Sequence, residues 1–123
     1  MATSTQSPVL TTSIKVYRDT AVNATKVENI NSGAATLYAV KMDNSANSST
    51  ATFFKLYDAT SITVGTTTPN MTFKVAGGAT TRVIIPKGIS FATGISYAAV
   101  TDGGGTAGTT APTNAIGIVL ALV

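Results

Sequence analysis

The sequence has 123 residues and a net charge of +3, with 44% hydrophobic and 11% charged residues. This length fits one domain, and the hydrophobic content excludes a disordered chain. Cys and His are both absent, which excludes a disulfide framework and a thiol nucleophile and leaves only carboxylates to bind zinc.

Low charge is the unusual feature of the composition. A typical soluble domain has about 25% charged residues, whereas here Thr, Ser, Asn and Gly supply most of the polarity. Because few charges repel one another, assembly with other protein surfaces is favoured. The eight basic residues are scattered along the chain, and this scatter argues against a nucleic-acid site.

Neither a targeting signal nor a membrane segment is expected. Residues 1–12 lack the basic and apolar stretches of a signal peptide. The longest apolar run, 116–123, is too short to cross a bilayer. We therefore expect synthesis in a cytoplasm and no contact with a membrane.

In chain order, the sequence begins with an arm and continues as short strands. Residues 1–12 are rich in Ser and Thr, and we interpret them as an extended N-terminal arm. Residues 13–123 are interpreted as a single domain. Alternating apolar residues and turn signals predict about eight strands in it, at 14–17, 25–30, 35–42, 52–57, 71–75, 83–85, 95–100 and 115–122.

Four segments carry more specific predictions. Residues 35–42 are apolar on both parities, which indicates cover on both faces of the strand. Pro86 is expected to end the strand at 83–85. The segment 102–112 contains three consecutive glycines and is expected to be a flexible loop. In 115–122 the larger side chains share one parity, which predicts one buried face.

These features together predict an all-β fold. No stretch keeps a 3.6-residue apolar stripe, and the abundant Thr favours strands. Many short strands with regular turns imply a β-sandwich or a barrel. Eight strands in two sheets would be a jelly roll, although the strand order does not follow from the sequence.

Candidates for chemistry are few. Four of the five carboxylates lie in or beside predicted turns, where Asp is favoured by turn geometry alone. The glycine run at 103–105 matches no phosphate-binding pattern, and no calcium-loop pattern is present. We therefore predict a protein without catalytic residues, a metal site or a cofactor, and not an enzyme.

A possible contact surface lies at 53–57. Phe53 and Tyr57 share a parity with Lys55, opposite to Phe54 and Leu56. If this parity faces outward, the two rings form an apolar patch for a partner. The alternative is that a second layer of the same chain packs on them.

From residue 52 onward the chain resembles a group of small phage and prophage virion proteins. The resemblance covers roughly the last 70 residues and rests on turn formers and core positions. Its motifs are KLYD at 55–58, VGT at 64–66, Pro69, MTFKV at 71–75, the glycines at 77–78, 83–86, 88–89, FATGI at 91–95 and AAVTD at 98–102. The resemblance implies β-sandwich modules, some of them similar to capsid cement, or decoration, proteins.

The expected function is therefore that of a capsid cement protein on the surface of a phage particle, made in the host bacterial cytoplasm. Its expected partners are the major capsid protein and copies of itself, as a homotrimer or homodimer. We expect the contacts to come from Pro8, Val9 and Leu10 of the arm and from Phe53 and Tyr57. The alternative function is a tail, baseplate or fibre module, including a glycan-binding adhesin.

Overall fold

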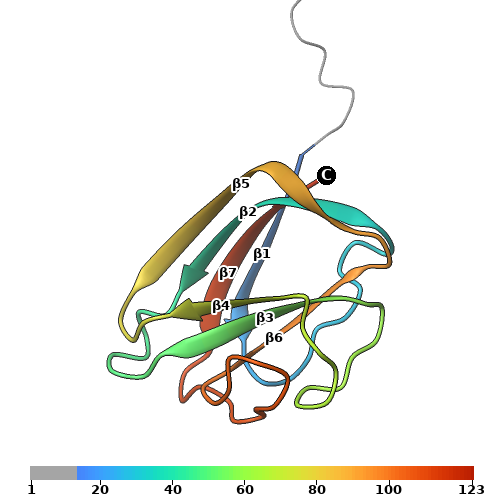
Figure 1. Cartoon of the computed structure of the whole chain (residues 1–123). Coiled ribbons are helices and arrows are strands. Elements are labelled where there is room, and N and C mark those ends of the chain that lie inside the picture. Colours follow the sequence, from blue (N-terminus) through green and yellow to red (C-terminus); the bar gives the residue numbers. More distant parts are fainter. Residues whose placement is uncertain (1–13) are drawn as a thin grey trace, which may run out of the picture.

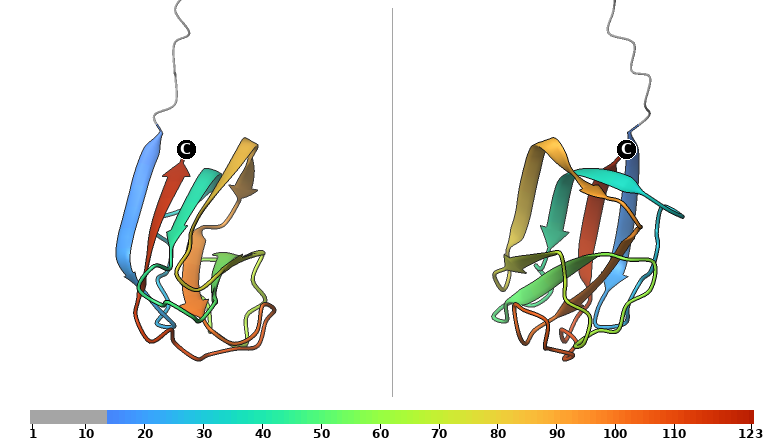
Figure 2. Two further views of the ribbon diagram at one scale, coloured as in Figure 1. Left: turned by 90° about the vertical axis from the view of Figure 1, so that its left-hand side faces the viewer. Right: turned by 45° about the vertical axis from the view of Figure 1, so that its right-hand side comes forward.

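The computed structural model describes residues 14–123, which form a β-sandwich of two antiparallel sheets (Figure 1). One sheet has the strand order β1-β7-β2-β5, and the other has the order β4-β3-β6. Figure 2 shows the two sheets facing each other as separate layers. The predicted all-β sandwich is confirmed. The strands are β1 (Lys15–Val22), β2 (Ala35–Asp43), β3 (Thr52–Asp58), β4 (Met71–Val75), β5 (Thr80–Phe91), β6 (Ile95–Val100) and β7 (Ile116–Leu122).

The core lies between the sheets and follows the alternation of their strands. In β7, every second residue from Ile116 to Leu122 is buried, as predicted, while the small residues between them are only half-buried. Phe54 and Leu56 of β3 are also fully buried and belong to the same apolar cluster. Period-two patterning therefore sets the inward face of both sheets.

Strand β2 has one buried face, and the prediction of cover on both faces is wrong. Its pairing register shifts between Leu37 and Ala39 on both neighbouring strands. This bulge adds one residue, so Leu37 and Val40 both turn inward although they differ in parity. The apolar residues on both parities reflect a change of phase within the strand.

Strand β5 continues through Pro86, where the sequence predicted its end. In the pairing with β2, the partner of Leu37 is Ile89 and the partner of Ala39 is Ile84, so the extra β5 residues bulge out around the proline. Because β5 is an edge strand, the proline's missing N–H is tolerated. Gly88 completes the bulge with a φ of +72°, and a Cβ there would lie 2.5 Å from the Thr36 Cγ2.

The expected strand at 25–30 is reduced to an isolated bridge, so the described residues contain seven strands. Val27 and Tyr97 exchange backbone hydrogen bonds of 2.9 and 2.8 Å, and the N–H of Ile30 donates to the carbonyl of Ile95 at 3.0 Å. Asn29, between these contacts, has a φ of +49°. A left-handed residue interrupts an extended ladder, so this segment covers the free edge of β6 without continuous pairing.

Candidate functional site

The outer face of β3 is covered by the chain itself. Tyr57 and Lys55 are fully buried, and Phe53 is half-buried. The segment 101–115 lies over Phe53 and Lys55: a Cβ on Gly104 would be 3.2 Å from the Phe53 ring, and Lys55 bonds to Ala107. The outward apolar patch is therefore wrong for Tyr57, and the alternative of a second packed layer is the one observed.

Internal hydrogen bonds hold this covering segment closed. The Asp102 carboxylate accepts a hydrogen bond from the N–H of Thr110 at 2.8 Å, and the N–H of Thr101 donates to the carbonyl of Thr110 at 2.9 Å. Gly108 has a φ of +113°, and a Cβ there would collide with the Asp102 carbonyl oxygen. Of the glycine run at 103–105, Gly103 likewise has a left-handed φ of +76°, so Gly103 and Gly108 are needed for tight turns, as in compact surface loops.

Two polar groups are buried on this outer face of β3. The Nζ of Lys55 donates a hydrogen bond to the carbonyl of Ala107 at 2.8 Å. Burial lowers the pKa of Lys55, and the nearby Asp102 partly offsets this effect. Burial also raises the pKa of Tyr57, whose hydroxyl has no hydrogen-bond partner among residues 14–123. Both groups lie inside the molecule, where no partner protein reaches them.

The outer face of the β1-β7-β2-β5 sheet, in contrast, is not covered by any other part of residues 14–123. Two cross-strand rows of side chains lie next to each other on this face. The cationic row runs Arg18, Val119, Lys41, Arg82, and the apolar row runs Val16, Ala121, Ala39, Ile84, each from β1 to β5.

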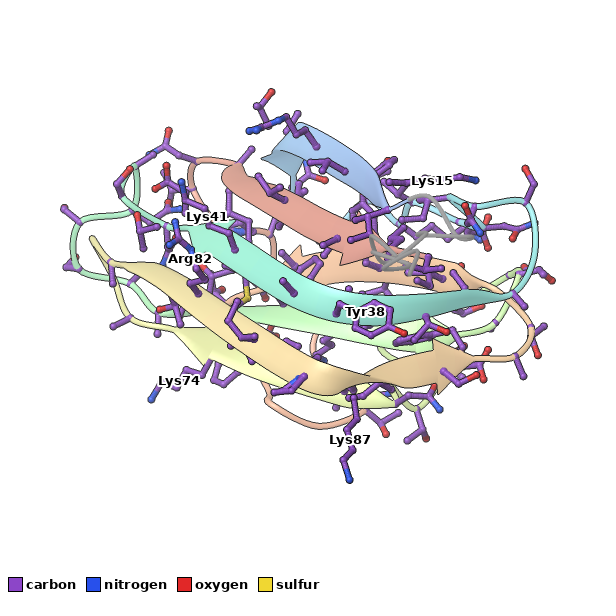
Figure 3. All side chains as sticks on the ribbon, turned by 90° about the horizontal axis from the view of Figure 1, so that it is seen from above. Lys15, Tyr38, Lys41, Lys74, Arg82 and Lys87 are labelled. Carbon is purple, nitrogen blue, oxygen red and sulfur yellow. The ribbon has the colours of Figure 1, made fainter. Side chains whose placement is uncertain are left out.

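Exposure and contour distinguish these rows from the core. The three cationic side chains are exposed, and Val16 and Ile84 are 61% and 63% exposed. A shallow hollow between the ends of the rows is floored by the small side chains of β7 and β2. Figure 3 shows Lys41 and Arg82 side by side on β2 and β5. We name this surface, formed by the two rows, the open sheet face.

The carboxylates are engaged in hydrogen bonds within the described residues. Asp19 and Asp43 each accept a bond from the backbone N–H two residues further on, as the turn interpretation predicted, whereas Asp58 and Glu28 bind segments distant in the sequence. Asp58 accepts hydrogen bonds from the backbone N–H groups of Ala92, Thr93 and Gly94 at 3.1, 2.8 and 3.3 Å. These bonds lower the pKa of Asp58. The N–H of Ile62 donates to Glu28 at 2.7 Å and likewise lowers the pKa of that carboxyl.

Metal-ligating side chains do not gather in groups of three or more within residues 14–123. In the same part of the chain, no helix has the length and apolar character needed to cross a membrane. Pro8, Val9 and Leu10, the other expected contacts, lie outside the described residues.

Comparison with known proteins gives no match, whether the chain is compared with protein-family models, with curated proteins or with solved structures.

The open sheet face is the main feature that sequence reasoning missed. Arg18, Lys41 and Arg82 are far apart in the sequence, and only the strand register brings them into one row. A partial signal was present, because Lys41 lies between the apolar Val40 and Met42 and so has the opposite parity. The outward direction of Lys41 was therefore predictable, but its alignment with Arg18 and Arg82 was not.

Proposed function

We propose that this protein is a phage virion structural protein, most specifically a capsid cement protein that stabilises the shell by binding the major capsid protein. The observation that carries the proposal is the difference between the two sheets. Residues 101–115 cover Phe53 and Lys55 on the outer face of β3, whereas residues 14–123 leave the outer face of β1-β7-β2-β5 exposed. An exposed sheet face with apolar side chains suits attachment to another protein.

The size of the open sheet face supports binding through more than one surface. Four strands at about 4.8 Å each span about 19 Å, and the eight residues of β1 extend about 26 Å. The face therefore offers about 500 Å², which is less than the about 800 Å² per partner in a standard interface. Further area would come from the N-terminal arm, which precedes β1 at the edge of this sheet, and from copies of the protein in a homotrimer or homodimer.

The strand order also supports the finer fold within this proposal, a jelly roll. The segment 23–30 lies along β6, so the second sheet has a fourth position beside β6-β3-β4. Counting this segment as a strand, the order is 1-8-3-6 in one sheet and 2-7-4-5 in the other. We interpret this order as two interleaved Greek keys, the arrangement of a jelly roll.

Copy number in purified particles tests the cement function. Quantitative mass spectrometry against the major capsid protein should find hundreds of copies per particle, on the outside of the shell. Particles made without the protein should lose DNA at lower temperature than particles that contain it. A count of tens or fewer, with the protein in the tail, would instead support the tail, baseplate or fibre function.

A truncation tests the arm. Removing residues 1–12 should abolish binding to the particle, while the far-UV circular dichroism and the thermal unfolding of the domain stay the same. Unchanged binding by the truncated protein would show that Pro8, Val9 and Leu10 are not contacts.

A further inference from the structure

The acidic and basic side chains of this protein differ in how many of them have hydrogen-bond or ion-pair partners. All five of its carboxylates accept hydrogen bonds within residues 14–123. Three of its eight basic side chains also have partners there: Lys15 with Asn31, Lys26 with Glu28, and Lys55 with Ala107. The remaining five form no hydrogen bond or ion pair within the described part of the chain: Arg18, Lys41, Lys74, Arg82 and Lys87.

Three of these five basic side chains gather on the open sheet face. Lys41 and Arg82 are direct cross-strand partners, and Arg18 joins the same row on the far side of Val119. Like charges placed directly opposite each other destabilise a sheet. Asp43 lies two residues beyond Lys41; hydrogen bonds from Ser45 mainly lower the pKa of Asp43, and the charge of Lys41 contributes. Within residues 14–123 no ion pair joins Arg18, Lys41 or Arg82 to a carboxylate, and the three cations of the row outnumber this one neighbouring carboxylate.

We propose that the open sheet face docks an acidic segment of a different protein. The carboxylates of that segment would lie over Arg18, Lys41 and Arg82. Its apolar side chains would lie over the neighbouring row, between Val16 and Ile84. The two rows are two residues apart on each strand, about 7 Å, so the complementary segment has carboxylates and apolar side chains at this spacing.

Two other occupants fit this surface less well. A second copy of the chain is a poorer source of carboxylates, because each of its five accepts a backbone hydrogen bond within residues 14–123 and residues 1–13 contain none. A nucleic acid would supply negative charge, but it would leave the exposed apolar row uncovered. Nucleic-acid sites also favour broad basic patches with aromatic side chains, which the two rows lack.

A titration of the full-length ¹⁵N-labelled protein tests the docking directly. The probe is a blocked peptide in which glutamate and leucine alternate at every second position with serine between them, so that both types lie on one face of the extended peptide about 7 Å apart. Its matched control has glutamine for glutamate. The acidic peptide should shift amide signals of β1, β2, β5 and β7 around the two rows, and the glutamine peptide should shift them far less. Shifts confined to other strands, or equal shifts with both peptides, would overturn the proposal.

Matched variants locate the charge that matters. The double variant Lys41→Gln/Arg82→Gln should weaken binding of the acidic peptide about tenfold. Lys74→Gln/Lys87→Gln removes the same charge from side chains that point away from the row in Figure 3, and it should change binding less than twofold. Equal weakening by both double variants would mean nonspecific charge attraction. Binding of duplex DNA more tightly than the peptide, with the same dependence on the row, would support nucleic acid instead.

Applied to the virus particle, this inference rests on the proposed function, and a second measurement separates the two. The Lys41→Gln/Arg82→Gln variant should occupy fewer sites on particles than the Lys74→Gln/Lys87→Gln variant. Full occupancy by both variants would overturn docking through the cationic row and leave the cement function in place. Peptide binding that depends on the row, with no copies on the shell, would overturn the cement function alone.

Discussion

The ammonium group of Lys55 donates a hydrogen bond to the carbonyl oxygen of Ala107, at 2.8 Å, from a side chain with no exposed surface. This bond connects β3 to the segment that covers it, which begins more than 40 residues later in the chain. A buried ammonium with one acceptor pays a desolvation cost that the bond only partly offsets. The covering segment is therefore held in place mainly by its packing against β3 and by its own turns.

Replacing Lys55 with Met should be neutral or should stabilise the protein by up to about 2 kcal/mol, because the methylene volume stays and the buried charge is removed. Lys55→Ala should instead destabilise it by about 2–4 kcal/mol, through the cavity it leaves. Urea unfolding followed by circular dichroism measures both. A strong loss in Lys55→Met would show that the hydrogen bond to Ala107 is essential.

The buried charge of Lys55 should also affect how stability depends on pH. Burial lowers the pKa of Lys55 in the folded protein below its ordinary value of 10.5. Between the lowered pKa of the folded state and 10.5, the unfolded chain therefore binds more protons than the folded one. The free energy of unfolding should therefore rise with pH in this window. The rise should be absent in Lys55→Met. Measurements should stop near pH 10, because tyrosines of the unfolded chain ionise above it.

The glycines of the covering segment differ in what they permit. Gly108→Ala should destabilise the protein by about 1–3 kcal/mol, since Gly108 has a φ of +113° and a Cβ would meet the Asp102 carbonyl oxygen. Gly105→Ala is the matched control, because a Cβ there meets nothing within 4 Å. It should change stability by less than about 0.5 kcal/mol. Equal effects of the two substitutions would contradict the close packing of this segment.

The sequence predicted those parts of the fold that local patterning controls. The buried parity of 116–122 and the burial of Phe54 and Leu56 follow from alternation, and the structure has both. Segments that depend on distant partners were predicted less well. The bulge in β2 and the passage of β5 through Pro86 depend on strand register and on an edge position, which no local pattern encodes.

The candidate site was likewise predictable where local patterning decides and not where a distant segment decides. The parity of Phe53, Lys55 and Tyr57 was correct, but whether that face meets solvent depends on a segment more than 40 residues further along the chain. Glycine content alone cannot distinguish a mobile loop from a tightly turned cover, because glycine adds freedom to the first and permits the left-handed residues of the second.

Asp58 connects the end of β3 to the turn before β6 through three backbone N–H groups. Asp58→Asn should lower stability at neutral pH, because a neutral amide oxygen accepts these bonds more weakly and its NH₂ group accepts none. The lowered pKa of Asp58 means that the wild type keeps this contribution above the ordinary value of 3.8 and loses it as pH falls below that value. Acid titration of urea unfolding should show a smaller loss in Asp58→Asn. Parallel curves for the two proteins would contradict this role.

For the like-charged pair Lys41 and Arg82 on the open sheet face, we predict that one substitution changes stability and binding in opposite directions. Arg82→Glu places a carboxylate directly opposite Lys41, replacing repulsion with attraction. It should raise the free energy of unfolding by about 0.2–1 kcal/mol at low salt, and the gain should shrink near 1 M salt, where the Debye length is about 3 Å. Lys87→Glu makes the same charge change in the β5 bulge and serves as the control.

The same Arg82→Glu protein should bind the acidic peptide at least as weakly as Lys41→Gln/Arg82→Gln does, despite its higher stability. Thermal unfolding at several salt concentrations and the peptide titration measure the two effects on one sample. If the sheet face had only a structural role, Arg82→Glu would gain stability without losing a binding function, because repulsion between two cations does not help the fold. Unchanged peptide binding by Arg82→Glu would therefore contradict docking at this row, and a loss of stability would contradict the opposition of Lys41 and Arg82.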